Sequence, residues 1–123
     1  MNLNDAPYDA LERIFHEPNR LAIMSALASA EQGLRFGDLK QVCNLTDGNL
    51  NRHLKALDEA KAISIWKRFV KGKPCTTVSI SKIGLKRFTE YLSALEKVLE
   101  SAKTAVSEET KEEGGMLGGF QNA

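Results

Sequence analysis

The chain has 123 residues, 42% of them hydrophobic, with a formal net charge of +1. This length can bury one modest core, so we expect a single domain. No run of about 18 apolar residues occurs, which argues against a membrane-spanning helix. The N-terminus lacks the basic and apolar blocks of a signal peptide, so we expect a soluble, cytoplasmic protein. Cys43 and Cys75 fit no paired metal or redox spacing, and we expect neither metal nor cofactor.

The small net charge conceals an uneven distribution. Residues 34–90 contain twelve Lys or Arg and five Asp or Glu, whereas the remainder contains five and eleven. A basic middle predicts contact with a polyanion. We favour nucleic acid over a membrane surface because the basic segment ends in a polar hairpin and lacks the apolar face of an interfacial helix.

Two helices are predicted at the start of the chain. Residues 6–16 carry apolar side chains at helical spacing and end at the sequence HEPN. Pro18 suits the first position of a second helix, where its missing N–H is not needed. That helix, residues 18–30, is expected in the core because of the apolar stripe Leu21, Ile23, Met24 and Leu27.

A helix-turn-helix pattern follows. Residues 34–36 allow at most an edge strand, and the sequence GDLKQVCN predicts a helix of two turns. Asn44 and Leu45 interrupt it, and the hydroxyl of Thr46 is expected to cap the next helix, residues 46–60. A short helix, a tight turn and a long helix are typical of this motif.

The helix predicted for residues 46–60 has two differently composed faces. Leu50, Leu54 and Leu57 share one stripe, whereas the polar residues Asn49, Asn51, Arg52 and Lys55 project away from it. One face should pack on the core while the other binds a ligand. His53 lies beside the leucines and is expected at the edge of the core rather than in a ligand site.

The next segment predicts an antiparallel hairpin with its tip at residues 71–74. Ile63, Ile65, Phe69 and Val70 favour a β-strand, and a second such run extends from Thr76 to Ile80. Pro74 should lie at the tip or on an edge, where a missing N–H is tolerated.

A long helix is predicted to follow, beginning at or near Ser81. It carries a heptad seam of about three repeats, formed by Leu85, Phe88, Leu92, Leu95, Leu99, Ala102 and Val106. The seam could cover the domain's own N-terminal helix or join two copies of the chain. We favour a homodimer because a small monomer seldom needs a helix of about 24 residues. Residues 107–123 are acidic and glycine-rich, which predicts a disordered tail.

The order of these elements predicts the fold: mainly α with a small β-hairpin wing (α+β), a winged helix-turn-helix with additional N- and C-terminal helices. We expect a DNA-binding domain over residues 6–81, a dimerisation helix over 82–106 and a tail over 107–123. Three segments resemble parts of MarR- and ArsR-type regulators. They correspond to the opening helix, the recognition helix and the wing: HEPNRLAIMSAL, TDGNLNRHLKALDEAKAISI and KRFVKGKPCTTVSISKIGLKRFTEYL. The wing matches the MarR-like subgroup, and the resemblance covers about residues 11–95.

The resemblance implies a transcriptional regulator whose recognition helix enters the major groove while the wing contacts the flanking backbone or minor groove. We assign base reading to Asn49, Asn51 and Arg52, whose side chains suit adenine and guanine. The expected backbone contacts are Thr46, Lys55, Lys67, Arg68, Lys71 and Lys73. A homodimer would bind an inverted repeat, in the nucleoid. An effector molecule is a further candidate partner.

One residue departs from the family pattern. Related domains usually end the recognition helix with a glycine, whereas this chain has Lys61. Lysine enters the left-handed conformation reluctantly, which predicts local strain.

Three other functions fit the sequence less well. An enzyme needs a nucleophile, acid or base brought together, and the chain has no phosphate loop, zinc signature or hydrolase elbow, so we expect no catalysis. Metal sensing of the ArsR type would need a thiolate cluster, which is missing around Cys43. The serious alternative is a winged helix used for protein contacts. The retained basic charge of recognition helix and wing favours DNA.

Overall fold

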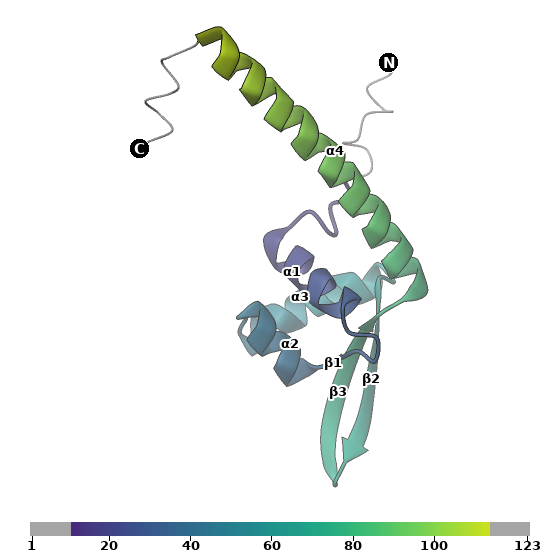
Figure 1. Ribbon diagram of the computed structural model, residues 1–123. Helices are drawn as coiled ribbons and strands as arrows, with labels where there is room; N and C mark the ends of the chain where they lie inside the picture. The colour runs from purple at the N-terminus through teal and green to yellow at the C-terminus, as the bar shows by residue number, and fades with distance from the viewer. Residues whose placement is uncertain (1–10, 114–123) are drawn as a thin grey trace.

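The structure, a computed structural model, describes residues 11–113 and contains helices and a small antiparallel sheet (Figure 1). The helices are α1 (Pro18–Ala28), α2 (Phe36–Cys43), α3 (Asp47–Glu59) and α4 (Lys82–Glu113). The strands are β1 (Leu34–Arg35), β2 (Ile63–Val70) and β3 (Lys73–Ile80), in the spatial order β1-β3-β2. The predicted α+β winged helix fold is confirmed.

Short-range signals set the helix boundaries. Pro18 holds Glu17 in an extended conformation, and the Glu17 carboxylate accepts the Arg20 N–H at 2.8 Å. Thr46 caps α3 as predicted, because its hydroxyl oxygen accepts the Asn49 N–H at 3.2 Å. The Ser81 hydroxyl oxygen similarly accepts the Gly84 N–H at 2.9 Å, just before α4. These caps satisfy N–H groups that have no partner inside a helix.

The helix predicted for residues 6–16 is wrong over its described part. Residues 11–17 form a turn, while residues 6–10 lie outside the described residues. The carbonyl of Ile14 has no helical donor, because the residue four positions later is Pro18, and it accepts the Arg20 Nε–H at 2.6 Å. Phe15 is fully buried, with its ring centroid 5.4 Å from that of Phe88 and 5.7 Å from that of Tyr91. The segment therefore packs against α4 through Phe15 and does not form the predicted helix.

The hairpin is longer than its sequence suggested. Lys71 and Gly72 form the turn with φ of 53° and 76°, the two positive values that a two-residue type I′ turn requires. Pro74 belongs to β3, opposite Phe69. Since β1 extends along β3 only as far as Thr77, Pro74 lies on an open edge and its missing N–H costs no pairing.

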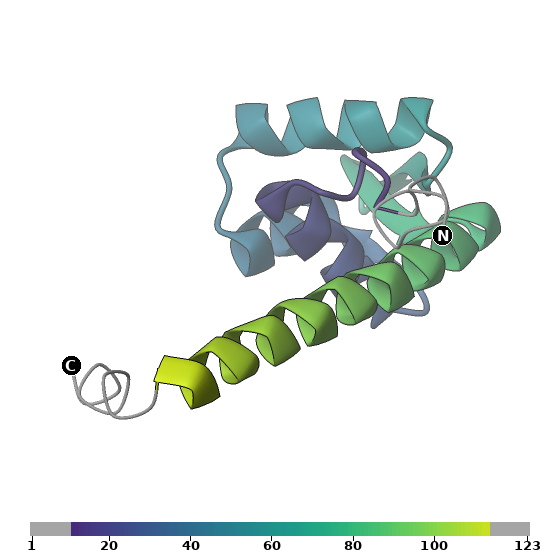
Figure 2. The ribbon, with the colours of Figure 1, turned by 90° about the horizontal axis from the view of Figure 1, so that it is seen from above.

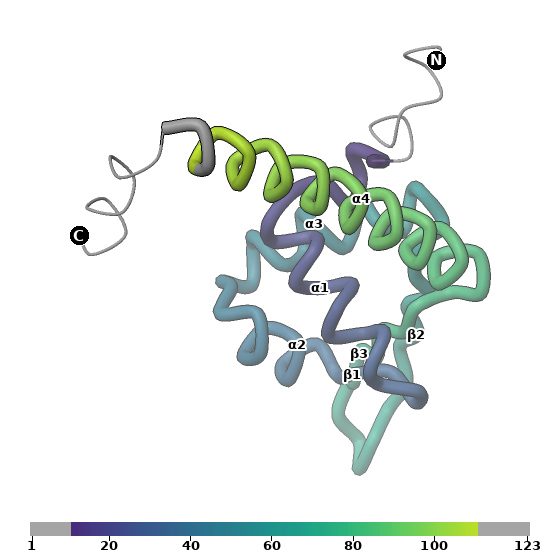
Figure 3. Tube along the Cα trace, turned by 45° about the horizontal axis from the view of Figure 1, so that its top comes forward, coloured from purple at the N-terminus to yellow at the C-terminus, as the bar shows by residue number. Residues whose placement is uncertain are grey.

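Helix α1 lies at the centre of the body (Figure 3), with α3 and α4 on opposite sides of it (Figure 2). The core cluster draws side chains from every helix and from the sheet: Phe15, Ile23, Met24, Leu27, Leu39, Leu50, Leu54, Leu57, Ala62, Ile63, Val78, Phe88 and Tyr91. The β2–β3 hairpin, hereafter the wing, projects beyond this body (Figure 1). No helix in residues 11–113 is long and apolar enough to cross a membrane.

Helix α4 continues farther than predicted. It extends to Glu113, so residues 107–113, which we expected to begin a disordered tail, are helical. Residues 114–123 of that expected tail lie outside the described part of the chain. Continuous helix-forming residues such as Glu108, Glu109 and Lys111 explain the extension, because no glycine or proline occurs between Gly84 and Gly114.

Candidate nucleic-acid interface

Helix α3 separates packing from solvent contact as its sequence predicted. Leu50, Leu54 and Leu57 are buried in the core, together with His53. On the opposite side, Arg52 and Lys55 are exposed. Gly48 lies on the same exposed side, and a Cβ added there would meet no atom within 4 Å. This side can therefore approach a ligand surface closely.

The three predicted base-reading residues do not form one cluster. Arg52 lies near the middle of the exposed side, but Asn49 and Asn51 are two residues apart and so point roughly 160° away from each other around the helix. Both are exposed. They flank Arg52 on opposite sides, so the two amides cannot address the same base pair.

An ion pair joins the two helices of the helix-turn-helix motif. Lys40 Nζ on α2 lies 2.8 Å from Asp47 Oδ1, in the first turn of α3. Asn44 makes the intervening turn in the left-handed conformation, with φ of 54°. Both charged side chains are largely exposed, so the pair contributes little stability. The ion pair does offset the negative charge of Asp47, which lies at the helix end that is expected to face phosphates. Lys40 was not identified from the sequence.

His53 anchors α3 to the start of α1. It is 2% exposed, and its Nδ1 lies 3.3 Å from Arg20 Nη1 and 3.7 Å from Glu17 Oε2. Because an arginine can only donate, Nδ1 accepts and the neutral ring carries its proton on Nε2. His53 Nε2 is buried without a hydrogen-bond partner among the described residues. The expectation that His53 belongs to the edge of the core is confirmed.

Burial is the main cause that lowers the pKa of His53. The Glu17 carboxylate opposes this effect, whereas the positive charges of Arg52 and Arg20 lower the pKa further. Burial would by itself raise the pKa of Glu17, but backbone hydrogen bonds from Arg20 and Asn19 and the nearby positive charges outweigh it, and the pKa is lowered. At neutral pH the site therefore holds a neutral His53 between an anionic Glu17 and a cationic Arg20.

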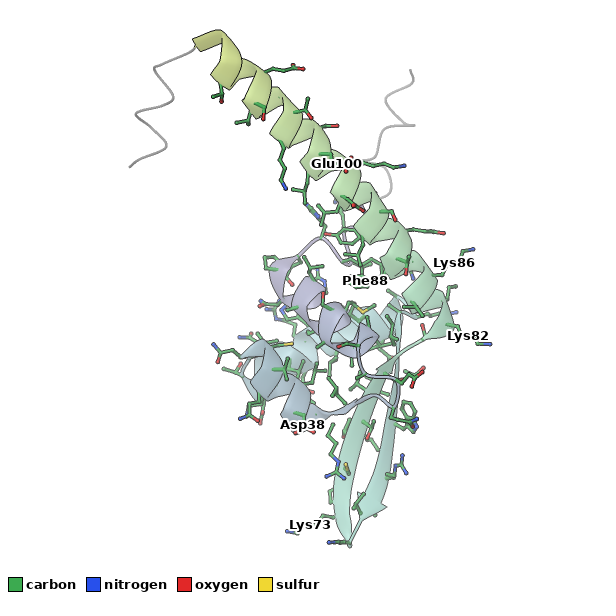
Figure 4. The ribbon with its side chains drawn as sticks, in the orientation of Figure 1. Asp38, Lys73, Lys82, Lys86, Phe88 and Glu100 are labelled. Carbon is green, nitrogen blue, oxygen red and sulfur yellow. The ribbon has the colours of Figure 1, made fainter. Side chains whose placement is uncertain are left out.

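The wing carries a concentrated positive charge. Its four cations are Lys67, Arg68, Lys71 and Lys73, all exposed, and Lys73 is seen near the tip in Figure 4. The segment from residue 63 to residue 80 contains no Asp or Glu, and none of the ion pairs between described residues involves these four side chains. Because side chains alternate along a strand, Lys67 and Arg68 stand on opposite faces of the wing.

The predicted seam of α4 divides into two groups. Phe88 is 2% exposed and packs on Phe15 and Tyr91 inside the domain, as Figure 4 illustrates, and Leu95 packs against the same core. Both were assigned to a dimer interface, and for Phe88 that assignment is wrong. The second group consists of residues spaced by seven, whose side chains are 42–63% exposed: Leu85, Leu92, Leu99 and Val106.

Two residues that complete the inward face were missed. Tyr91 is 1% exposed, and its hydroxyl lies 2.9 Å from His16 Nδ1. Burial raises the pKa of the Tyr91 hydroxyl. Arg87 donates to the Ala60 carbonyl at 2.7 Å and pairs with Glu12 at 2.7 Å. A helical wheel would have placed them near Phe88, but a heptad count that considers only the seam positions passes over them.

Comparison with known proteins agrees with this geometry. The family model described as a winged helix DNA-binding domain matches residues 19–99. An uncharacterized protein of Methanocaldococcus jannaschii is 36% identical over 80 residues, covering 65% of this chain and 86% of the relative.

Solved structures show the same fold. A transcriptional regulator homologue from Pyrococcus horikoshii OT3 has a TM-score of 0.69 and 27% identity, over 77% of this chain and 94% of that one. The Staphylococcus aureus MepR–DNA complex has a TM-score of 0.61 at 15% identity, over 87% and 88% of the two chains. The winged helix part of the resemblance is thereby confirmed.

Proposed function

Because this chain belongs to the family of winged helix DNA-binding domains, we propose that it is a transcriptional regulator that binds double-stranded DNA sequence-specifically. The observation that carries the proposal is the pairing of an exposed cationic α3 face with a wing that has four cations and no acid. Helix α3 lies in the major groove, and the wing follows the flanking backbone or minor groove.

Each predicted contact has a role in this arrangement. Arg52 faces a guanine, and Asn49 and Asn51 read base edges on either side of it. Thr46 and Lys55 contact phosphates at the two ends of α3, and the four wing cations do so along the flanking DNA. The basic charge favours this function over a protein-contact module, because such modules often lose the basic charge of the recognition helix and wing, whereas both keep it here.

The salt dependence of binding tests the proposal. Fluorescence anisotropy on a mixed-sequence duplex should give a slope of log affinity against log salt of about −5 if some six cations neutralise phosphates. Charge reversal at Lys71 and Lys73 to Glu should weaken binding to every sequence and make the slope shallower. No binding at low salt would refute the DNA function, and an unchanged affinity in the double variant would remove the wing from it.

We also propose that the chain is a homodimer joined along α4. The exposed stripe of Leu85, Leu92, Leu99 and Val106 has the seven-residue spacing of a coiled-coil seam. Most of the residues of α4 after Leu95 are exposed, although most helical stability in proteins comes from the packing of an apolar face. A partner helix would supply the missing burial. Two α3 helices would then face an inverted repeat with half-sites about 10 bp apart.

The dimer is testable with charge-matched variants. Leu92→Glu with Leu99→Glu places two carboxylates in the stripe, whereas Ser93→Glu with Ser101→Glu places two on exposed positions of α4 outside it. Light scattering at micromolar concentration should report a dimer for the native chain and the serine variant and a monomer for the leucine variant. A monomeric native chain would refute the proposal.

We propose a site for a small-molecule effector on the domain. A cavity of about 300 Å³ lies between α1 and α4, lined by His16, Glu17, Pro18, Leu21, Tyr91 and Leu95. This volume suits a small molecule. Leu21→Trp would fill the cavity, so a compound that raises the melting temperature of the native chain through this cavity should leave that of the variant unchanged.

A further inference from the structure

An exposed aromatic side chain on the wing has no role in the proposed contacts. Phe69 is 76% exposed, the highest exposure among the large apolar residues described. Lys67 and Arg68 precede it, Lys71 lies in the turn and Lys73 lies across the turn. The wing therefore presents a large apolar side chain among cations that are proposed to face DNA, where a partner can contact it.

The strand register shows which way Phe69 points. Phe69 alternates with Ile63 and Ile65, and these two contact the core, so Phe69 stands on the core-facing side of the sheet but beyond the core. Its cross-strand neighbour is Pro74. Pro74 also lines a hollow of about 360 Å³ between β3 and the start of α2. Phe69 and Pro74 thus form an apolar edge on the core-facing side of the wing.

Resting on the proposed DNA function, we propose that Phe69, backed by Pro74, enters the minor groove as an apolar wedge against the sugars and a base step. The surrounding cations favour a polyanionic partner. An apolar protein surface or lipid chains would leave these cations without opposite charges, so DNA is the better fit. Phe and Pro side chains are among those that proteins insert between minor-groove base steps, where they partly unstack the bases.

The wedge makes a prediction that the cations alone do not. Loss of an aromatic stacked on a base costs roughly tenfold in affinity, whereas the number of released counterions is unchanged. Phe69→Ala should therefore weaken binding roughly tenfold at each salt concentration and leave the salt slope unaltered. A duplex containing 2-aminopurine should brighten on binding the native protein, because unstacking relieves quenching, and should stay dim with Phe69→Ala.

Trp66→Ala is the matched control. Trp66 is an exposed aromatic on the same strand, but its side chain stands on the opposite face of the wing. It should change neither the affinity nor the 2-aminopurine signal, and melting temperatures confirm that each variant is folded at the assay temperature. Phe69→Leu, which keeps an apolar side chain, should retain most of the affinity.

The outcomes separate the wedge from the DNA function. If the native protein binds with a steep salt slope but Phe69→Ala binds equally well, the wedge is refuted and the DNA function stands. A weaker affinity accompanied by a shallower slope would also refute it, since the substitution would then have displaced the cations. Absence of native binding refutes the DNA function itself.

Discussion

Arg20 on α1 and His53 on α3 meet through a contact of 3.3 Å between Nη1 and Nδ1, which links the two helices through one buried ring. His53 can accept from Arg20 only while Nδ1 is unprotonated. A second proton would place two positive charges at this distance, offset only by Glu17, whose carboxylate lies 3.7 Å away.

Stability should therefore fall as pH decreases below about 6.5, the ordinary pKa of histidine. The pKa of His53 is lowered in the folded state, so the unfolded chain binds the proton first and folding loses free energy as the pH drops through this window. Glu17, with its lowered pKa, adds a separate loss below about 4.5. Urea unfolding at pH 7.5 and pH 5.5 measures the first effect.

His53→Asn is the control for this pH dependence. The asparagine amide oxygen lies at the position of Nδ1 and can accept from Arg20, but the amide does not titrate. The variant should show little change in unfolding free energy between pH 7.5 and pH 5.5. A native protein that is equally stable at both values would contradict the prediction.

Lys61→Gly should raise the melting temperature by a few degrees. Lys61 has a φ of 62°, so the left-handed conformation expected from its position is confirmed. That conformation costs a residue with a Cβ about 1–2 kcal/mol, partly offset by the greater freedom of an unfolded glycine. Lys61→Ala keeps the Cβ and should leave stability nearly unchanged. If alanine stabilised as much as glycine, the side chain rather than φ would be responsible.

Gly84→Ala should destabilise the domain by more than about 2 kcal/mol. A Cβ at this position would lie 1.9 Å from the Ala62 carbonyl oxygen, which belongs to backbone and cannot rotate away. Gly48→Ala is the comparison, because a Cβ there meets nothing within 4 Å and alanine favours a helix. Thermal melts should move in opposite directions, and equal shifts would contradict the close approach of α4 to Ala62.

Asn49→Ala and Asn51→Ala should relax specificity at two different base pairs. Their side chains point to opposite flanks of α3, so each amide can reach only bases on its own side of Arg52. Loss of a good bidentate contact costs about 1–3 kcal/mol of discrimination. Binding-site selection with each variant measures this, and loss of preference at one shared position would contradict the geometry.

The order of elements and several of their boundaries were predictable from the sequence. Pro18 and Thr46 act within their own helix ends, and the KGKP segment acts within its own turn, so neighbouring residues alone specify them. The polar face of α3 was likewise predictable, because the spacing of Leu50, Leu54 and Leu57 defines the opposite side.

Contacts between distant segments decided the rest. Helical spacing in residues 11–16 could not show that Arg20 would take the Ile14 carbonyl or that Phe15 would turn into the core. The heptad pattern of α4 indicates that apolar residues recur along one face. It does not show which of them pack inside the domain, so Phe88 was assigned to the wrong surface. The exposure of Phe69 depends on where the core ends along the sheet. A periodic pattern specifies which residues share a face, whereas only the packed chain determines what that face meets.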